Sequence, residues 1–308
     1  MKALLLKAYH KLRFALLSRR RREIRVMSAG ETTEALTERR CSAARFGDGE
    51  LNMILRAVHG YDSSLESGFQ SYDDSLGLRL KEVLESVSSQ TDCLVCLPGC
   101  LFAGGTSYLR SKAAAYWESY AAGKLNKVLP LLDRSYRYGD SLFTRFYLSH
   151  KDKSRCREHL NGMQAIWSGR NILIVEGEKT RLGAGNDLFC EASDVKRILC
   201  PPTDAWGQYD KILSAVKEAV PPTADDPAQT LVLCALGMTA TVLAYDLSQA
   251  GYQAIDLGHI DIEYEWMRMG ATDKVPVPGK YTNEAYGEVS DSIPGMDSYR
   301  REIIRTIS

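Results

Sequence analysis

Two carboxylates separated by one glycine are the residues in this sequence whose types and spacing best suit chemistry. Asp48 and Glu50 lie in Arg45-Phe46-Gly47-Asp48-Gly49-Glu50, between an apolar run and a segment with helical spacing. Carboxylate oxygens are preferred ligands of Mg²⁺ and Mn²⁺, which often bridge them to substrate phosphates. The structural alternative is that Asp48 caps the helix and Glu50 lies in its first turn, where the helix dipole favours negative charge. The spacing alone leaves both interpretations open.

A second acidic group follows Gly258-His259, where Asp261, Glu263 and Glu265 alternate with apolar residues. On a helix over 261–269, Asp261 and Glu265 share a face and Glu263 points elsewhere. Clustered carboxylates raise one another's pKa unless a cation neutralises them, which indicates a candidate site. The alternative is an acidic, solvated first turn beside a structural His259.

The loop over 179–187 follows an apolar run at 171–175 and is rich in polar residues and glycine. Arg181 and Lys179 are candidate phosphate ligands, and Gly183 and Gly185 would allow a ligand to approach the backbone closely. The loop matches neither the Walker pattern nor the dinucleotide-binding fingerprint. It therefore predicts a binding loop of another kind, or a solvated connection.

Gly237 and Thr239 mark a third candidate site, where an apolar run over 230–236 passes into a helical pattern. The free backbone N–H groups and the dipole of a helix N-terminus can bind an anion there. Tight packing of the helix on the strand explains the same residues without a ligand.

The elements that must position these residues alternate between strand and helix. Apolar runs predict strands at 42–46, 93–97, 171–175, 195–199, 230–236 and 252–257, mostly with helical patterns between them. This order predicts an α/β, Rossmann-like doubly wound fold with a mostly parallel sheet and helices on both faces. Helices are also expected from Thr106 to Tyr120 and over 296–306. The basic and aromatic stretch 131–150 either binds phosphates or sugars or covers the sheet.

Composition excludes some classes of protein. Hydrophobic residues make up 44% of the 308 residues, which is typical of a folded globular chain. Lys plus Arg and Asp plus Glu are both 39, so no overall field attracts nucleic acid, and we expect no nucleic-acid partner. Cys93 and Cys96 have redox-motif spacing inside an apparent buried strand, where a structural role is favoured. The scattered cysteines favour a reducing cytoplasm.

Residues 1–30 are expected to form a basic N-terminal helical segment, and 31–308 the main domain. Apolar residues within 1–26 can share a helical face beside several Lys and Arg. The run is too short to span a bilayer, which needs roughly 18 apolar residues, and too basic for a signal peptide. One interpretation is peripheral contact with the inner face of an anionic membrane. The other is a helix docked on the domain or on a partner.

Four stretches together resemble the GT-D-fold glycosyltransferases, bacterial enzymes of surface glycan and glycoprotein assembly. The stretches are 45–50, 183–187, 237–240 and 256–266, in the order expected across 40–288. The resemblance implies a UDP-sugar donor and a divalent metal, Mn²⁺ or Mg²⁺, held by Asp48 and Glu50. It also implies active-site roles for His259 and Glu265.

The resemblance predicts transfer of a hexose from a UDP-sugar to a hydroxyl of a glycan or glycoprotein acceptor. Glu265 is the preferred general base, Asp261 and Glu263 are alternatives, and His259 would orient the base or contact phosphate. Predicted contacts to the donor are Arg45, Arg181, Gly183, Gly185, Asn186, Gly237 and Thr239. Two other hypotheses are a non-catalytic nucleotide-binding module of a glycan assembly complex and another α/β transferase with a phosphorylated donor, such as a pyruvyl transferase.

Overall fold

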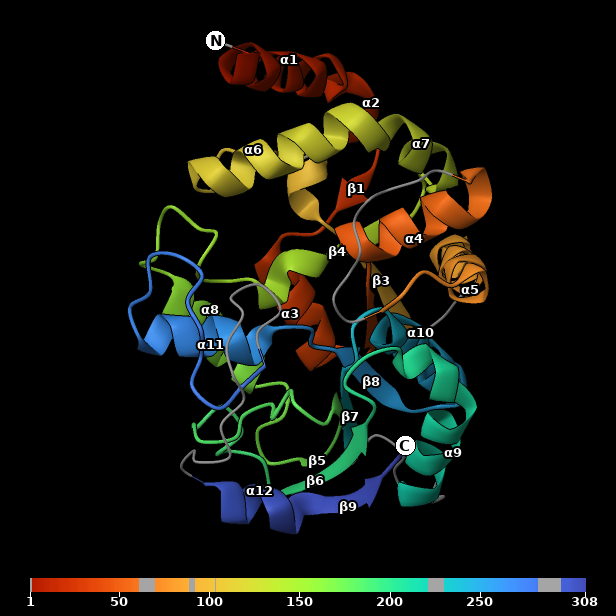
Figure 1. Cartoon of the computed structure of the whole chain (residues 1–308), viewed down its shortest axis with the longest axis vertical. Coiled ribbons are helices and arrows are strands. Elements are labelled where there is room, and N and C mark those ends of the chain that lie inside the picture. Colours follow the sequence, from red (N-terminus) through yellow and green to blue (C-terminus); the bar gives the residue numbers. More distant parts are fainter. Residues whose placement is uncertain (1, 61–69, 89–91, 103, 221–229, 282–294) are drawn as a thin grey trace.

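The computed structural model describes residues 2–60, 70–88, 92–102, 104–220, 230–281 and 295–308 (Figure 1). Their strands form one nine-stranded, wholly parallel sheet in the order β1-β4-β3-β2-β8-β7-β5-β6-β9. The strands are β1 (Arg25–Val26), β2 (Ser42–Arg45), β3 (Cys93–Leu97), β4 (Arg137–Asp140), β5 (Asn171–Gly177), β6 (Asp194–Cys200), β7 (Thr230–Ala235), β8 (Gln253–Asp256) and β9 (Ile303–Thr306).

Helices cover both faces of this sheet (Figure 1). They are α1 (Lys2–Leu16), α2 (Ser18–Arg22), α3 (Ala29–Glu38), α4 (Asp48–His59), α5 (Asp74–Glu85), α6 (Ser111–Tyr120), α7 (Asn126–Val128), α8 (Cys156–Gln164), α9 (Tyr209–Ala219), α10 (Met238–Gln249), α11 (Ile260–Arg268) and α12 (Met296–Glu302). The predicted α/β doubly wound architecture is therefore confirmed.

The strands are apolar on both sides because both faces of the sheet are covered. Along β5, Ile172 and Ile174 pack toward α8 and α11, whereas Leu173 and Val175 pack toward α9 and α10. Successive strand residues point to opposite faces, so a doubly covered strand is a continuous apolar run rather than an alternating one. This is why the six predicted strands could be located from the sequence.

Three strands were not predicted: β1, β4 and β9. The expected helix over 296–306 ends at Glu302, and the chain continues as β9 beside β6. The helix expected from Thr106 begins only at Ser111, after Arg110 as its N-cap. Both expectations were wrong at their boundaries.

The strand order reverses between β2 and β8, near the middle of the sheet. The chain runs outward from β2 through β3 to β4 and then crosses to the other half of the sheet, where β8 is the strand that pairs with β2. In open α/β sheets the crevice outside the carboxyl ends of such strands is the usual ligand site. Residues that follow β2 and β8 are therefore the first candidates for contacts with a ligand.

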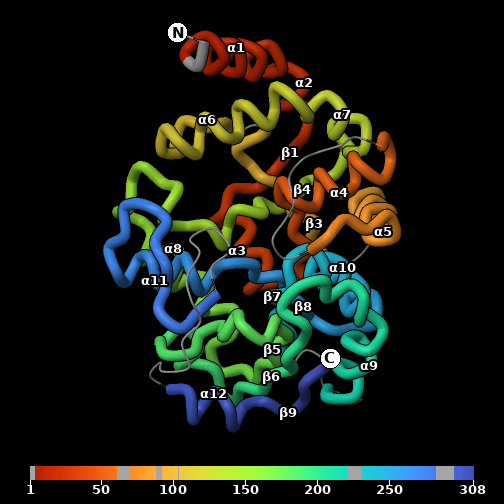
Figure 2. The backbone as a smooth tube through the Cα atoms, in the orientation of Figure 1, coloured from red at the N-terminus to blue at the C-terminus, as the bar shows by residue number. Residues whose placement is uncertain are grey.

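The N-terminal segment is joined to the domain by packing and by strand pairing. Helix α1 packs against α6 at one end of the molecule (Figure 2), and β1 pairs with β4 at the edge of the sheet. None of the helices in the described ranges is long and apolar enough to cross a membrane.

The eight cysteines are all free thiols. Seven are buried, and Cys190 is exposed. Cys93 and Cys96 lie in the buried strand β3, where burial raises the pKa of the Cys93 thiol to about 12 and that of Cys96 well above its ordinary value. This supports the packing role over the redox role for the pair.

Candidate active site

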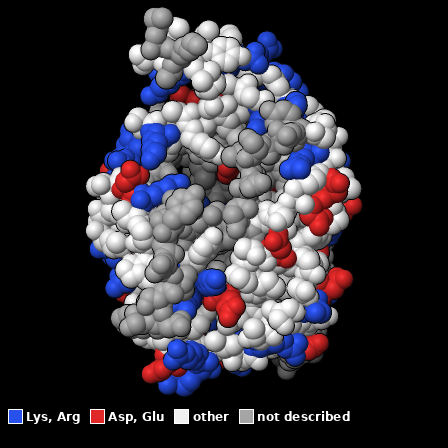
Figure 3. All heavy atoms as spheres, viewed as in Figure 1, with Lys and Arg blue, Asp and Glu red and all other residues white. Residues whose placement is uncertain are grey.

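A cleft of about 1040 Å³ opens at the carboxyl ends of the central strands. Figure 3 shows a hollow in the face that Figure 1 views. Residues after β2, β7 and β8 line the cleft, together with the first turns of α4, α10 and α11 and part of α6. Seven predicted site residues line it, namely Arg45, Asp48, Glu50, Gly237, His259, Asp261 and the alternative base Glu263. Its size is sufficient for a nucleotide-sized ligand.

The other predicted residues do not line the cleft. They are Arg181, Gly183, Gly185, Asn186, Thr239 and Glu265. The structure thus brings together residues of the stretches 45–50, 237–240 and 256–266, whereas no residue of 183–187 lines the cleft.

Asp48 and Glu50 both face the cleft from the first turn of α4. The N-cap of this helix is Gly47, whose backbone N–H donates a hydrogen bond to Oε2 of Glu50 at 2.7 Å. Glu50 therefore caps the helix, and the expectation that Asp48 would do so was wrong. Asp48 instead accepts a hydrogen bond from the hydroxyl of Tyr116 on α6.

The position of Glu50 makes its charged form costly. Burial, the carboxylate of Asp256 and the carboxylate of Asp48 raise the pKa of Glu50 to about 7. Burial also raises the pKa of Asp256, while Arg45 opposes the shift. A cation among these three acids would stabilise their ionised forms.

This donor set fits a divalent cation that is shared with a substrate. Among the residues that the structure describes, no three His, Cys, Asp or Glu side chains form a ready metal site. Mg²⁺ and Mn²⁺ in phosphate-binding sites are commonly held by one or two carboxylates plus the phosphates themselves. Asp48 and Glu50 can supply those two carboxylates. Two carboxylates are too few to hold an ion that has no ligands from a substrate.

Arg45 is the last residue of β2, and its guanidinium lies against the turn that follows β8. Its guanidinium donates a hydrogen bond to the hydroxyl of Thr144, and its Nε is buried with no partner among the described residues. Gly258 has φ +50°, and a Cβ built on it would lie 2.6 Å from Nη1 of Arg45. Only glycine fits this turn, because any side chain would displace the arginine.

Arg145 and His259 form a second polar pair in the cleft lining. Nη2 of Arg145 lies 2.5 Å from Nδ1 of His259. A guanidinium has no acceptor atom, so Nδ1 must accept and Nε2 carries the ring proton. Glu263 supports this arrangement, since its Oε1 lies 3.8 Å from Nη1 of Arg145. Its Oε2 accepts hydrogen bonds from the backbone N–H groups of Tyr147 and Leu148 at 2.9 and 2.8 Å.

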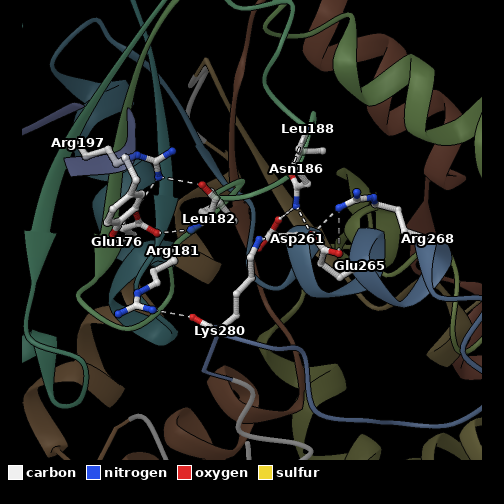
Figure 4. A network of polar contacts seen from close by, with 12 residues as sticks. Glu176, Arg181, Leu182, Asn186, Leu188, Arg197, Asp261, Glu265, Arg268 and Lys280 are labelled. Atoms are coloured by element: carbon white, nitrogen blue, oxygen red, sulfur yellow. Dashed lines mark hydrogen bonds and ion pairs between the residues drawn. The ribbon is translucent and has the colours of Figure 1, made fainter. Parts of the chain in front are cut away.

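Asp261 and Glu265 belong to a polar network behind the cleft wall (Figure 4). Nδ2 of Asn186 donates to Oδ1 of Asp261 at 2.7 Å and to Oε1 of Glu265 at 2.6 Å. Nζ of Lys280 lies 2.5 Å from Oδ2 of Asp261 and 3.7 Å from Oε1 of Glu265. The Glu265 side chain also pairs with Arg268 at 3.1 Å and is 12% exposed, against 2% for Asp261. The two carboxylates are therefore coupled, although only Asp261 lines the cleft.

The loop over 179–187 supports the cleft wall. Arg181 has φ +52° and donates from Nη1 to the carbonyl of Gly279 at 2.9 Å. A Cβ on Gly183 would lie 2.5 Å from Phe189, so this glycine serves close packing. Neither residue lines the cleft, so the phosphate contact through Arg181 and the close approach of a ligand at Gly183 stay predictions.

The N-termini of α10 and α4 lie against each other in the cleft. Gly237 has φ +56° and turns the chain from β7 into α10. A Cβ on Gly49 would come within 3.0 Å of the Cε atom of Met238. Thr239 is fully buried, and its hydroxyl has no hydrogen-bond partner within the described part of the chain. Two positive helix ends therefore face one space, which favours an anion.

Several cleft residues were not among the predicted site residues, and three of these interact with predicted ones: Asp256, Arg145 and Tyr116. Asp256 stands at the end of a correctly predicted strand, so the strand-end rule could have identified it. Arg145 belongs to the basic and aromatic stretch 131–150, for which binding of phosphates or sugars stays a prediction. Arg145 lines the cleft, whereas Tyr138, Phe146 and Tyr147 are buried. Nothing local in the sequence indicated Tyr116.

Comparison with known proteins identifies the family. The family model described as "Glycosyltransferase GT-D fold" matches residues 43–285. The chain belongs to this family. The predicted resemblance to GT-D-fold glycosyltransferases is thereby confirmed.

Similar proteins agree with this membership. The chain is 35% identical to "Glycosyltransferase GlyD" of Streptococcus pneumoniae serotype 4 over 286 residues, 92% of this chain and 33% of the relative. It is 37% identical to "Probable glycosyl transferase Gly" of Streptococcus gordonii over 263 residues, 85% of this chain and 36% of the relative. The chain thus spans about a third of the length of these curated relatives.

Solved structures of GT-D-like proteins share the whole fold. One, described as "The highly conserved domain of unknown function 1792 has a distinct glycosyltransferase fold", has a TM-score of 0.81 and 34% identity over 96% of this chain and 100% of its own. Another, "A New Glycosyltransferase (DUF1792) from Streptococcus sanguinis", has a TM-score of 0.79 and 33% identity over 92% of this chain and 100% of its own.

Proposed function

We propose that this GT-D-fold chain transfers a hexose from a UDP-sugar to a hydroxyl of a glycan or glycoprotein acceptor, with Mn²⁺ or Mg²⁺ as cofactor. The observation that carries the proposal is the meeting of Asp48 and Glu50 with two helix N-termini in one cleft. Carboxylates for a cation and N–H groups for an anion in the same space suit a diphosphate better than a neutral ligand.

Asp48 and Glu50 would hold the cation. When bound, the cation supplies positive charge that neutralises the diphosphate leaving group. The hydroxyl of Tyr116 orients the Asp48 carboxylate through its hydrogen bond, and the Gly47 N–H orients that of Glu50. Both carboxylates are thus held in place before the donor arrives, which lowers the cost of reorganisation.

Hydrogen-bond donors in the cleft, both cationic and neutral, would bind the rest of the UDP-sugar. Arg145 lines the cleft, and its contact with Nδ1 leaves Nε2 of His259 as a hydrogen-bond donor. The backbone N–H groups at the start of α10 add partial positive charge. These groups together would stabilise the negative charge that develops on the leaving phosphate.

For the acceptor side, we propose that the coupled pair of Asp261 and Glu265 provides the general base. Asp261 lies in the cleft wall, and Glu265 is the more exposed of the two. Lys280 and Asn186 contact both carboxylates and hold the two side chains in position. A carboxylate held in position within reach of an acceptor hydroxyl can take up its proton.

The decisive experiment is calorimetric titration of the protein with UDP, first with Mn²⁺ and then with EDTA, followed by a screen of UDP-sugars for hydrolysis and transfer. Metal-dependent UDP binding with turnover supports the proposal. UDP binding without turnover, even with acceptor glycans present, would favour the non-catalytic module. Turnover of another phosphorylated donor in preference to UDP-sugars would favour the other transferase class.

A further inference from the structure

Helix α1 presents an apolar stripe to solvent. Leu5, Tyr9, Leu12 and Leu16 follow one another at intervals of four, three and four residues, which places them on one side of a helix. Their exposed fractions are 64%, 52%, 60% and 69%. These four residues are called the α1 stripe below.

The opposite side of α1 is fixed to the domain. Phe14 and Leu17 are buried in the core that includes residues of α6. The guanidinium of Arg21 lies 4.1 Å from the ring centroid of Phe14 and donates a hydrogen bond to the carbonyl of Phe102. Packing therefore holds the helix in one rotation about its axis and leaves the α1 stripe exposed. Helix α1 itself lies at one end of the molecule (Figure 2).

Basic side chains are frequent in α1 and α2. On α1, Lys7 and Lys11 lie on the side of the helix away from the α1 stripe, and Lys7 lines a hollow beside Glu118 of α6. From residue 2 to residue 22 the sequence contains no Asp or Glu, and its basic residues are Lys2, Lys7, Lys11, Arg13, Arg19, Arg20, Arg21 and Arg22. Of these, Lys7, Lys11, Arg19, Arg20 and Arg22 are exposed. The local charge is thus strongly positive although the whole chain is neutral.

We propose that α1 and α2 form a docking surface for an anionic lipid bilayer. The α1 stripe would enter the region between headgroups and acyl chains, and the exposed arginines of α2 would contact anionic headgroups. Exposed apolar patches of this kind mark interaction sites, and an anionic surface is the partner whose charge is complementary. A second copy of the chain is a poorer partner, because the exposed arginines of the two copies would be brought close together and repel one another.

The docking surface lies on the side of the cleft that α6 forms. Helix α1 packs on α6, and α6 supplies Tyr116, Trp117 and Ser111 to the cleft lining. A bilayer bound to α1 would therefore be separated from the cleft by α6. This proposal does not depend on the identity of the donor.

The test is co-sedimentation of the full chain with vesicles of phosphatidylcholine alone and of phosphatidylcholine with phosphatidylglycerol. The paired variants are Leu5→Ser with Leu12→Ser, and Arg19→Gln with Arg22→Gln. Matched controls are Leu78→Ser with Ile304→Ser, and Arg300→Gln with Arg301→Gln, which change exposed side chains elsewhere. Circular dichroism verifies that each variant is folded.

We expect the intact chain to bind only the anionic vesicles, and less tightly at high salt. The leucine pair should lose binding, and the arginine pair should weaken it by about fivefold for each arginine removed. Both controls should bind like the intact chain. Absence of binding by the intact chain, or equal binding by the leucine pair and its control, would overturn the proposal. So would sedimentation velocity showing a lipid-free dimer that the leucine pair dissociates, since a second copy would then cover the stripe.

Discussion

Nζ of Lys280 lies 2.5 Å from Oδ2 of Asp261, and each of these side chains is only 2% exposed. The contact ties the segment after α11 back onto that helix. The next residue, Tyr281, lines the cleft, and its backbone N–H donates to the carbonyl of Lys179 at 3.1 Å. This buried ion pair therefore joins the wall of the cleft to the loop over 179–187.

Replacing Lys280 with Met should destabilise the protein. The substitution leaves Asp261 buried without its cation, which typically costs about 3–5 kcal/mol in the free energy of unfolding. Chemical denaturation measures the change. The control is Lys217→Met on the exposed side of α9, which should change the free energy by less than about 0.5 kcal/mol. Equal effects at the two positions would show that the buried pair does not stabilise the fold.

Asp48→Asn combined with Glu50→Gln should abolish metal-dependent binding of UDP while preserving the fold. Glutamine can still accept the hydrogen bond from the Gly47 N–H, so the cap of α4 is retained without the charge. Calorimetry with Mn²⁺ and with EDTA measures the loss. Glu82→Gln on α5, an exposed acid outside the cleft lining, is the control. UDP affinity that survives the double substitution in Mn²⁺ would contradict the metal role.

The raised pKa of Glu50 predicts how stability depends on pH. Its pKa of about 7, against an ordinary 4.5, means that the folded protein holds this proton more tightly than the unfolded chain. The resulting stabilisation is complete below about pH 4.5 and is lost as the pH rises through 7, with a slope of at most about 1.4 kcal/mol per pH unit. Glu50→Gln should remove this slope, so the free energies of unfolding of the two proteins should diverge between about pH 4.5 and 7.5.

The same group predicts how cation binding depends on pH. A cation must compete with the proton on Glu50, so Mn²⁺-supported UDP binding should strengthen as the pH rises through about 7. Titration calorimetry on either side of that pH measures this. Affinity that stays constant over this range would argue against Glu50 as a ligand.

Gly258→Ala should impair activity more than its effect on stability explains. The new Cβ would lie 2.6 Å from Nη1 of Arg45 and must displace it. Gly270→Ala is a matched control, because Gly270 also has a positive φ, +62°, but a Cβ there would meet no atom of a more distant residue within 4 Å. Both substitutions should cost about 1–2 kcal/mol of stability from the backbone alone. Only Gly258→Ala should weaken binding of the UDP-sugar. Equal activities of the Gly258→Ala and Gly270→Ala proteins would show that Arg45 does not contribute to the site.

Conservative substitutions can show which of the two carboxylates proposed as the general base accepts the proton. Glu265→Gln and Asp261→Asn should each lower turnover by about 10²–10⁴-fold if that residue accepts the proton, with little change in UDP affinity. Glu302→Gln on α12, an acid outside the cleft lining that pairs with Arg197, controls for loss of an ion pair. Wild-type turnover in both the Glu265→Gln and the Asp261→Asn protein would exclude these two carboxylates as the general base.

Much of the fold could be predicted because most of the six predicted strands are buried on both faces and are therefore largely apolar. Strand β6 departs from this pattern, since its first residues include polar, exposed side chains. The three strands that were missed carry a different pattern. Strand β1 has two residues, β4 includes Arg137 and Asp140, and β9 is mostly exposed, so none is a continuous apolar run. Their pairing depends on neighbouring strands that are distant in sequence, which local periodicity cannot indicate.

The site was predictable where residues follow strands and not where distant segments meet. Asp48, Glu50 and His259 follow strands β2 and β8, and all three line the cleft. The turning of Arg181 toward Gly279 could not be anticipated, because the segment after residue 270 has no regular pattern. The contact of Lys280 with Asp261 and the approach of Tyr116 to Asp48 are likewise long-range consequences of packing.

The distribution of thiols allows selective labelling of the protein without mutagenesis. Seven cysteines are buried, and burial raises the pKa of each of their thiols, so little thiolate is accessible at neutral pH. Cys190 is exposed, in the connection between β5 and β6. A maleimide dye should therefore attach to Cys190 alone in the native protein, giving a single fluorescent reporter with the natural sequence intact.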